Sequence, residues 1–428
     1  MERRTFVLMS GSALAAGVVG ACGRRPRLQE KIASLRDAMA TRVAHHEFPG
    51  AVWLVEKGDE VAFDAVGVTA IGGTAPMRRD TIFRIASMTK AITATAVMML
   101  VEEGKLTLDA PVERWLPEIA GRRVLRRIDG PLDDTVPARR PITVRDLLTF
   151  TLGFGLLFDD TLPIQRAIDE LRLVNGAPVP MTPHPPDEWM RRFGTLPLMY
   201  QPGERWMYNT GSLLQGVLVR RASDRPFEAF VRERITGPLG MRDTDFFVPP
   251  TKLARFAGCG VYTNPQTRTQ TRMDQDGAAS AYAGPPVFPS GAAGLVSTVD
   301  DYLTFARMLL HRGAYPGGRL LGEQSVRDMT TDQLTPEQKA ASRFFPGFFD
   351  THGWGYGMAV ITAPDAVSRV PGRYGWDGGF GTSWLNDPGR DLIAIVMTQS
   401  SDFLFSGALD AFWRGVYGAV DRSVLTAG

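Results

Sequence analysis

The chain has 428 residues, of which 44% are hydrophobic and 22% are charged, a composition typical of a globular protein with a sizeable core. Its length indicates two or three domain-sized units, or one large enzyme with two lobes. The formal net charge is only +2 and no run of five or more basic residues occurs, so nucleic-acid binding is not indicated. Two cysteines can form neither a disulfide framework nor a zinc cluster, and the five histidines form no metal-ligand pair. We therefore expect no metal and no cofactor.

Residues 1–22 are predicted to be an export signal that does not belong to the fold. The pair Arg3-Arg4 precedes a small, apolar run from Thr5 to Ala21, which resembles a twin-arginine signal. The run ends at Cys22 in a segment that resembles a bacterial lipobox, in which the cysteine carries lipid after cleavage. A plain signal peptide or a membrane helix are the alternatives, although the apolar run is short for a spanning helix. We expect an exported protein that is periplasmic or attached to the membrane through Cys22.

Strands are predicted near both ends of the chain and helices in the middle. An amphipathic helix over 28–43 precedes a hairpin over 51–67, and a segment over 81–86 leads to residue 87. The C-terminal part has predicted strands at 354–361, 382–385 and 392–397 and a final helix over 407–420. The fold class is therefore mixed α/β (α+β), with an antiparallel sheet built from both chain ends and flanked by helices.

The predicted domain organisation follows from this pattern. Residues 28–103 and 290–428 form an α/β domain, and residues 104–289 form an inserted, mainly helical domain. Within the insertion, Thr143 is a predicted N-cap of a helix over 144–148. Two long polar or proline-rich segments, 121–141 and 159–198, are expected to form rims or lids of a site.

The most informative motif is Ser87-Met88-Thr89-Lys90, at the start of a predicted helix. The residues that follow, 91–101, have almost no polar face, so we expect a helix that is buried on all sides. Side chains three residues apart lie on one face of a helix. A serine hydroxyl beside an amine in an apolar setting is one way to make an activated nucleophile. Alone, the Ser-x-x-Lys pair is a weak signal, because serine is also a common helix N-cap.

The common nucleophile motif of α/β-hydrolases is absent. No serine has glycine at both the −2 and the +2 position, so the sequence contains no G-x-S-x-G elbow. A second candidate segment covers residues 201–211, in which a Pro-Gly turn precedes Tyr208 and an apolar helix follows.

Four segments occur in the order seen in the serine β-lactamase superfamily. They are Ser87-x-x-Lys90, residues 147–153, the segment around Tyr208, and residues 291–298. Over about residues 28–420 the chain thus resembles penicillin-binding proteins, class C β-lactamases and family VIII carboxylesterases. This resemblance implies a β-lactamase/penicillin-binding-protein-like fold. It also implies that Ser87 is acylated, that Lys90 takes the serine proton or stabilises it electrostatically, and that Tyr208 passes the proton to the leaving group.

The implied roles carry expectations about ionisation. Burial should lower the pKa of Lys90, and a nearby lysine cation should lower the pKa of Tyr208. Both changes would move these groups toward the range that suits general acid–base catalysis. One position departs from the family pattern, which usually reads Tyr-x-Asn. Here the third position is Thr210, and we expect the adjacent Asn209 to point elsewhere.

The last family motif bears on the substrate. β-Lactamases and transpeptidases carry Lys-Thr-Gly, or a histidine variant, on an edge strand, where the cation holds the substrate carboxylate. The last lysine of this chain is Lys339, and the last histidine, His352, begins a segment (352–357) that precedes the expected position. We interpret that segment as structural. The matching segment, Trp376-Asp377-Gly378, resembles the Trp-Gly-Gly of family VIII carboxylesterases.

This alignment implies the substrate-binding residues. The N–H of Gly379 would join the N–H of Ser87 in an oxyanion hole, beside Gly378 and the polar side chain of Thr210. Trp376 would offer an apolar wall, whereas Asp377 departs from the pattern and adds a negative charge. A site with these residues in place of a cation should bind a carboxylated β-lactam poorly.

The first functional hypothesis is an exported serine hydrolase, most consistent with a carboxylesterase for small or medium acyl esters. The alternatives on the same machinery are an acyltransferase, an amidase or a D-amino-acid peptidase, and a β-lactamase or D-Ala-D-Ala carboxypeptidase. A non-catalytic binding protein would need a disabled triad, whereas all three members are present. The expected partner is a small ester or amide and not a nucleic acid.

Overall fold

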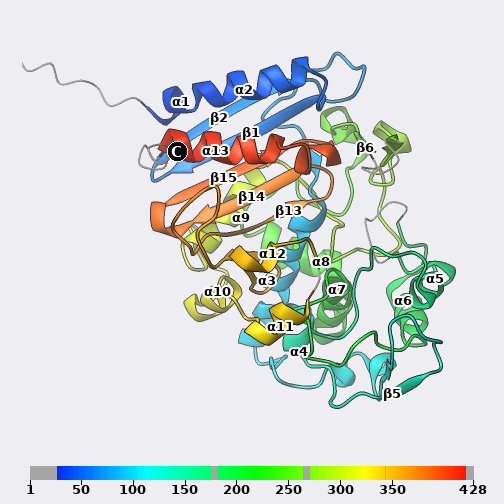
Figure 1. Cartoon of the computed structure of the whole chain (residues 1–428). Coiled ribbons are helices and arrows are strands. Elements are labelled where there is room, and N and C mark those ends of the chain that lie inside the picture. Colours follow the sequence, from blue (N-terminus) through cyan, green and yellow to red (C-terminus); the bar gives the residue numbers. More distant parts are fainter. Residues whose placement is uncertain (1–26, 175–180, 264–269, 343, 421–428) are drawn as a thin grey trace, which may run out of the picture.

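The computed structural model describes residues 27–174, 181–263, 270–342 and 344–420 (Figure 1). The predicted export signal, with Cys22, lies outside the described residues. Within those ranges, no helix has the length and apolar character that crossing a bilayer requires.

A seven-stranded antiparallel sheet joins the two ends of the chain, as predicted. The strand order is β11-β12-β13-β14-β15-β1-β2, and β1 pairs along its length with β15, with Val52 opposite Met397. The strands are β1 (Gly50–Lys57), β2 (Glu60–Gly67), β11 (His352–Trp354), β12 (Ala359–Ile361), β13 (Tyr374–Gly378), β14 (Thr382–Asp387) and β15 (Leu392–Met397).

Helices cover both faces of this sheet. The helices α1 (Leu28–Lys31), α2 (Ala33–Ala44) and α13 (Ala408–Val420) lie on one face, here called the outer face, whereas α3 (Thr89–Glu102) and α9 (Val299–Leu310) lie on the inner face (Figure 1). Every residue of β15 is buried, because its alternate side chains join the separate hydrophobic cores of the two faces. Such continuous apolar runs are typical of strands that are covered on both sides.

The helical part of the molecule lies beneath the inner face and is built around α3 and α7. All side chains of α3 from Thr89 to Leu100 are buried, as its apolar sequence predicts. The other helices are α4 (Val144–Leu148), α5 (Pro163–Glu170), α6 (Pro186–Phe193), α7 (Thr210–Ser223), α8 (Phe227–Val231), α10 (Glu323–Met329), α11 (Pro336–Ala341) and α12 (Phe348–Thr351). Two-stranded pairs are β3 (Phe83–Arg84) with β8 (Val296–Ser297), β4 (Arg123–Leu125) with β5 (Thr135–Pro137), β6 (Val261–Thr263) with β7 (Gln270–Arg272), and β9 (Ala314–Tyr315) with β10 (Gly318–Arg319).

Two predicted elements were wrong in detail. The single strand predicted over 354–361 is a hairpin of β11 and β12, because the chain reverses between them and Gly357 adopts a φ of +80°, a conformation that favours glycine. The first amphipathic helix is interrupted at Ile32, between α1 and α2. The N-cap prediction at Thr143 is confirmed, since its side chain accepts a hydrogen bond from the N–H of Asp146.

Candidate active site

The candidate nucleophile lies at the entrance to α3. Ser87 is part of a short 3-10 turn, η1 (Ala86–Met88), directly before the helix. The preceding residue, Ala86, has a φ of +42°, a strained conformation for a residue with a side chain. Backbone strain of this kind persists only where the surroundings impose it, and it is found disproportionately at functional sites.

Lys90 lies one helical turn beyond Ser87 and is completely buried. Its Nζ donates one hydrogen bond to Ser87 Oγ at 2.9 Å and another to the carbonyl oxygen of Ala292 at 2.7 Å. Because burial removes water from the ammonium form, the pKa of Lys90 is well below its ordinary value of 10.5. The predicted lowering of the Lys90 pKa is thereby confirmed in direction, and it favours the neutral amine, which is the form that can accept a proton.

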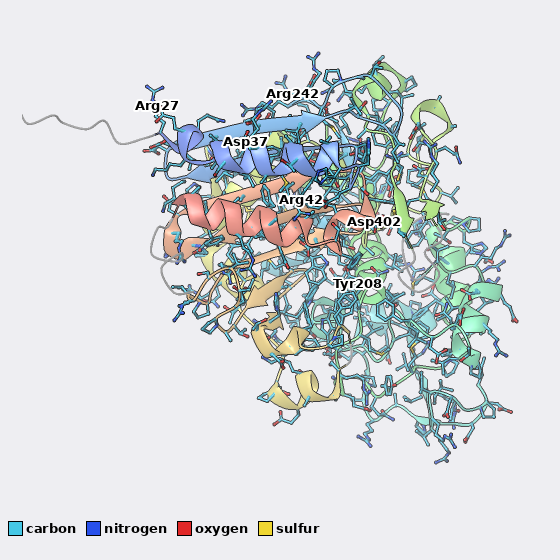
Figure 2. All side chains as sticks on the ribbon, turned by 45° about the horizontal axis from the view of Figure 1, so that its top comes forward. Arg27, Asp37, Arg42, Tyr208, Arg242 and Asp402 are labelled. Atoms are coloured by element: carbon cyan, nitrogen blue, oxygen red, sulfur yellow. The ribbon has the colours of Figure 1, made fainter. Side chains whose placement is uncertain are left out.

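Tyr208 lies between the sheet and the helical part of the molecule (Figure 2). The side chain of Ser87 is near enough to lower the pKa of the Tyr208 phenol, and the phenol accepts a hydrogen bond from Trp376 Nε1 at 2.8 Å. The Nζ of Lys90 lies 4.5 Å from the centre of the tyrosine ring. The three side chains that the Ser-x-x-Lys and tyrosine motifs single out are therefore brought together.

The expected lowering of the Tyr208 pKa was wrong. Burial raises that pKa well above its ordinary value of 10.0, since an aromatic cluster removes water from the phenol. Ring centres of Phe150 and Trp354 lie 5.9 and 6.3 Å from that of Tyr208. The phenol therefore keeps its proton at neutral pH, and Lys90 is the better base.

The predicted Trp376 segment lies at the end of β13, beside the nucleophile. A methyl group on Gly378 would come within 2.3 Å of the carbonyl oxygen of Ile85, so this glycine permits the close approach of β13 to the turn that carries Ser87. The next residue, Gly379, is exposed and lines the cavity together with Ser87. Its N–H is thus placed among the groups that border the nucleophile.

Asp377 lines the same cavity but differs from Trp376 in its surroundings. Its carboxylate accepts a hydrogen bond from Ser383 Oγ at 2.5 Å, on the next strand. Successive side chains of a strand point to opposite faces, so this carboxyl lies across β13 from the indole that contacts Tyr208. Burial raises its pKa to about 6.

The expectation for Thr210 and Asn209 was wrong. Thr210 is fully buried at the start of α7 and is not among the residues that line the cavity, whereas Asn209 lines it. Asn209 is the central residue of a γ-turn, with φ of +84° and ψ of −57° and a hydrogen bond from the N–H of Thr210 to the carbonyl of Tyr208, a rare and strained conformation. The polar side chain after Tyr208 that borders the site is therefore Asn209.

The interpretation of residues 352–357 as purely structural was wrong in part. Trp354 packs at 4.9 Å from Trp376, ring centre to ring centre, and so supports the site. His352 lines the cavity, where its ring stacks on Phe348 and burial lowers its pKa. Lys339 lies on α11 and pairs with Asp332 at 2.5 Å, away from the nucleophile.

A cavity of about 650 Å³ extends from Ser87, within the ~300–1,000 Å³ range of small-molecule sites. Beside the nucleophile it is bordered by Leu156, Tyr208 and Trp376, and its mouth is bordered by Phe158, Phe345 and Phe405.

The two long insertions were expected to form rims or lids of the site, but their described residues do not border this cavity. None of the described residues of 121–141 or 159–198 lines the cavity, and the second of these segments instead contributes Trp189 and the apolar face of α5 to the core.

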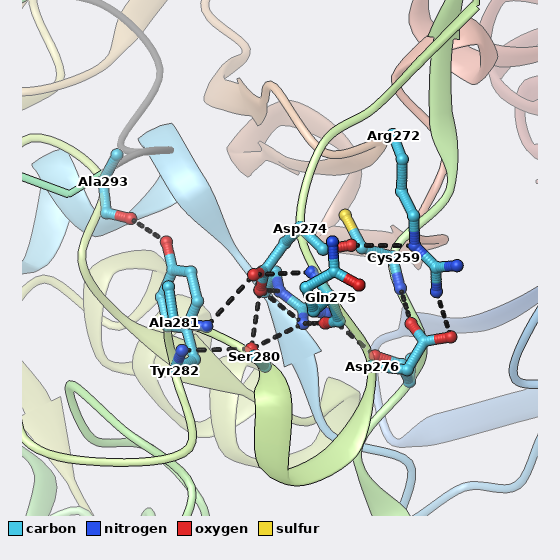
Figure 3. A network of polar contacts seen from close by, with 11 residues as sticks. Cys259, Arg272, Asp274, Gln275, Asp276, Ser280, Ala281, Tyr282 and Ala293 are labelled. Atoms are coloured by element: carbon cyan, nitrogen blue, oxygen red, sulfur yellow. Dashed lines mark hydrogen bonds and ion pairs between the residues drawn. The ribbon is translucent and has the colours of Figure 1, made fainter.

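A buried ion pair anchors the backbone next to the nucleophile (Figure 3). Arg84, three residues before Ser87, pairs with Asp274 at 2.7 Å, and their side chains are 2% and 4% exposed. Ser280 Oγ also donates to Asp274, at 2.6 Å. Tyr282 donates its hydroxyl proton to the carbonyl of Ala293 at 3.2 Å, the residue after the carbonyl that holds Lys90.

The sequence analysis predicted neither this network nor the phenylalanine side chains that border the cavity. The two Phe-Phe pairs at 344–345 and 348–349 are the one signal in the sequence that could have indicated the aromatic side chains around the cavity.

Within the described ranges, no group of three or more His, Cys, Asp or Glu side chains is arranged to hold a metal ion. Burial raises the pKa of the Cys259 thiol to about 11, so this cysteine stays protonated and is a poor nucleophile.

The sequence matches the family model described as Beta-lactamase over residues 35–418. The chain belongs to the beta-lactamase family. Among its relatives, Protein Rv1367c of Mycobacterium tuberculosis is 42% identical over 81% of this chain and 84% of its own length. Esterase EstB of Burkholderia gladioli is 32% identical over 84% of this chain and 88% of its own length.

Solved structures with this family's fold superpose over most of the chain. EstCE1, described as a hydrolase with promiscuous acyltransferase activity, has a TM-score of 0.73 at 22% identity and covers 91% of this chain and 98% of its own. Simvastatin synthase from Aspergillus terreus has a TM-score of 0.73 at 23% identity and covers 92% and 99%. At these identities the likeness shows the fold alone.

The two pKa shifts predict the pH profile of this family member. If neutral Lys90 is required, kcat/KM for an uncharged ester should fall as the pH drops through the Lys90 pKa, which lies well below its ordinary value of 10.5. The alkaline decline from ionised Tyr208 should begin above the ordinary tyrosine value of 10.0. Initial rates between pH 4 and 10.5 test this. A profile that rises only near pH 10 would show that Lys90 keeps an ordinary pKa.

Proposed function

We propose that the protein is a serine hydrolase of carboxylic esters, in which Ser87 forms an acyl-enzyme that water then releases. The observation that carries this proposal is the contact of Ser87 Oγ with Lys90 Nζ at 2.9 Å, in a cavity that Tyr208 also lines. A nucleophile within hydrogen-bond reach of a base, which is itself held by a further group, is the arrangement that activates a hydroxyl. Here the carbonyl of Ala292 holds the base.

The proposed acylation step begins with the serine proton. As Ser87 Oγ bonds to the ester carbonyl carbon, its proton passes to the neutral amine of Lys90. When the tetrahedral intermediate collapses, the carbon–oxygen bond to the alcohol breaks, and Tyr208 passes a proton from Lys90 to the departing oxygen. The raised pKa of Tyr208 supports this order, since a phenol that keeps its proton can donate it to an alkoxide.

The negative charge of the intermediate needs hydrogen-bond donors. The N–H groups of Ser87 and Gly379 are the proposed donors, because β13 ends directly against the turn that carries Ser87. Backbone donors of this kind are already in position before the charge develops and lose little to reorganisation. Water that enters after the alcohol has left would attack the acyl-enzyme by the reverse proton path.

The groups around the nucleophile favour an uncharged substrate. Trp376 takes the position that a lysine or histidine holds in the carboxylate-binding members of the superfamily, and Lys339 is already paired with Asp332. A substrate carboxylate brought beside Trp376 would lose water without gaining a cation, which is costly. This comparison favours esters over carboxylated β-lactams. Some relatives are named esterases and another is named an acyltransferase. Both names are compatible with an acyl-enzyme in this protein that passes its acyl group to water or to an alcohol.

The test compares the protein with Ser87→Ala on nitrophenyl acetate, a fluorophosphonate probe and a chromogenic cephalosporin. We expect the probe to label the protein, and kcat/KM for the acetate to fall by at least ~10³-fold in the variant. Hydrolysis of the cephalosporin should be slow beside that of the ester. Absence of labelling would overturn the proposal, and rapid cephalosporin hydrolysis would overturn the substrate argument. Adding an alcohol acceptor in the same assay would reveal acyl transfer as a second product.

A further inference from the structure

The cavity that begins at Ser87 does not end at the groups that surround the nucleophile. It continues past β13 onto the outer face of the sheet. There it is lined by a second set of mainly apolar side chains, here called the far arm: Val367, Leu385, Leu404, Leu409 and Trp413. They come from the loop before β13, from β14, from the 3-10 turn at Ser401–Leu404 and from α13. None of them is needed for the proposed chemistry at Ser87.

The pairing of the strands explains why the cavity can pass from one side of β13 to the other. β12 pairs with only the first two residues of β13, Tyr374 and Gly375. The end of the strand, from Trp376 onward, therefore pairs with a strand on one side only, which is β14. Trp376 and Asp377 point to opposite faces here, yet both line the cavity.

Exposed aromatic side chains line the mouth of this continuous cavity. Phe158, Phe345 and Phe405 are 68%, 48% and 64% exposed. Their ring centres are linked at 6.0 Å, from Phe158 to Phe345, and at 6.4 Å, from Phe345 to Phe405. Large apolar side chains that gather in the open at a cavity mouth are typical of sites that receive an apolar ligand.

The charges of the far arm restrict that ligand further. Three carboxyl groups line the cavity there, Asp365, Asp377 and Asp410. The one arginine among the described lining residues, Arg373, already pairs with Asp365 at 2.5 Å. The remaining described lining residue with a basic ring, His352, has a lowered pKa and is neutral at pH 7. A ligand with a negatively charged far end would therefore meet carboxylates without a free cation.

We propose that the far arm holds the acyl chain of the substrate, and that this chain is long, apolar and without a negative charge at its far end. The inference rests on the proposed ester hydrolysis and names the substrate class. The acyl chain, and not the alcohol, is assigned to the far arm because the alcohol must leave beside Tyr208, whose hydroxyl contacts Trp376 on the other side of β13. Burial of each additional methylene adds transition-state binding, by the hydrophobic effect.

The test uses nitrophenyl esters of acetic, butyric and decanoic acid, together with decyl acetate, whose long chain is on the alcohol side. We expect kcat/KM for the decanoate to exceed that for the acetate by at least about tenfold. Decyl acetate should show no such gain over ethyl acetate. A decanoate analogue with a carboxylate at the far end of the acyl chain should lose the gain. A flat or falling series from acetate to decanoate, or a gain with decyl acetate alone, would overturn the proposal.

Substitutions locate the effect within the molecule. Val367→Trp and Leu404→Trp would each fill part of the far arm, and we expect the ratio of decanoate to acetate kcat/KM to fall about tenfold in both. Val370→Trp is the matched control, because Val370 is 46% exposed and does not line the cavity, and its ratio should stay at the wild-type value. An unchanged ratio in both far-arm variants would assign the chain preference to another surface.

The two proposals can fail separately. Inactivation of Ser87 by alkyl fluorophosphonates with ethyl and decyl chains measures chain binding without turnover. If the probe labels Ser87 and acetate is hydrolysed but the decyl reagent reacts no faster than the ethyl reagent, the far-arm proposal fails and the hydrolase proposal stands. If neither reagent labels Ser87, the hydrolase proposal itself fails.

Discussion

Replacing Lys90 by methionine should lower kcat/KM for an uncharged ester by about 10²- to 10⁴-fold, the range for the loss of a general base. Methionine is close to lysine in length and suits a buried position, so the helix should still form. The variant loses the amine whose Nζ lies 2.9 Å from Ser87 Oγ, and with it the acceptor for the serine proton. Steady-state rates, with circular dichroism to check folding, measure the effect.

Two controls sharpen this prediction. Lys105→Met makes the same chemical change at an exposed lysine that pairs with Glu103 at 2.9 Å, and its activity should match that of the wild-type protein. Lys90→Arg places a permanent cation at the position and removes the proton acceptor, since a guanidinium remains charged at every pH of interest. We expect no rescue by arginine. Substantial activity in either Lys90 variant would mean that another group takes the proton.

The second large effect concerns stability. Asp274→Asn should lower the free energy of unfolding by about 3–5 kcal/mol, because removal of one member of a buried ion pair leaves the other charge uncompensated. Arg84 would be that charge, and its side chain is 2% exposed. The carboxylate of Asp274 also accepts hydrogen bonds from the backbone N–H groups of Gln275 and Ala281, so few groups can rearrange to replace it. Urea denaturation measures the change.

Arg272→Gln provides the matched control in the same network (Figure 3). Arg272 pairs with Asp276, but the two side chains are 47% and 41% exposed, and exposed pairs contribute only ~0–1 kcal/mol. The denaturation midpoint of this variant should therefore stay close to the wild-type value. A similar small shift in Asp274→Asn would contradict the role assigned to the buried pair. Esterase activity measured in both variants would show whether the network also holds Lys90 in position.

The elements that could be predicted from the sequence are those with a strong local pattern. The helix after Ser87, the first hairpin and the strand at 392–397 follow from local patterns. The burial of the helix and of the last strand on all sides explains why their apolar runs are so clear. The Ser87–Lys90 contact follows from helical geometry alone. Tyr208 and the Trp376 segment required the family resemblance, because no local rule indicates that they meet the serine.

The remaining features depend on tertiary packing, which local patterns do not contain. The γ-turn at Asn209 accompanies the exchange of the expected roles of that residue and Thr210. The high pKa of Tyr208 depends on rings from three distant segments, which include Phe150 and Trp354. The ion pair of Arg84 with Asp274 joins residues that lie 190 positions apart. The cavity reaches the far arm beside the end of β13, with which β12 does not pair.

The pairing of β1 with β15 has a consequence for biosynthesis. β1 leaves the ribosome early, but its partner strand is among the last parts of the chain to be made, so one edge of the first hairpin stays open until translation is nearly complete. Contacts between such distant segments form slowly, and open strand edges invite association with other chains. A chain that stops before residue 392 would also lack the strand that holds β14, and with it the support of β13 beside Ser87. We therefore expect a nascent or truncated chain to be both inactive and prone to aggregate. Activity should appear only after β15 has been made and has paired with β1 and β14.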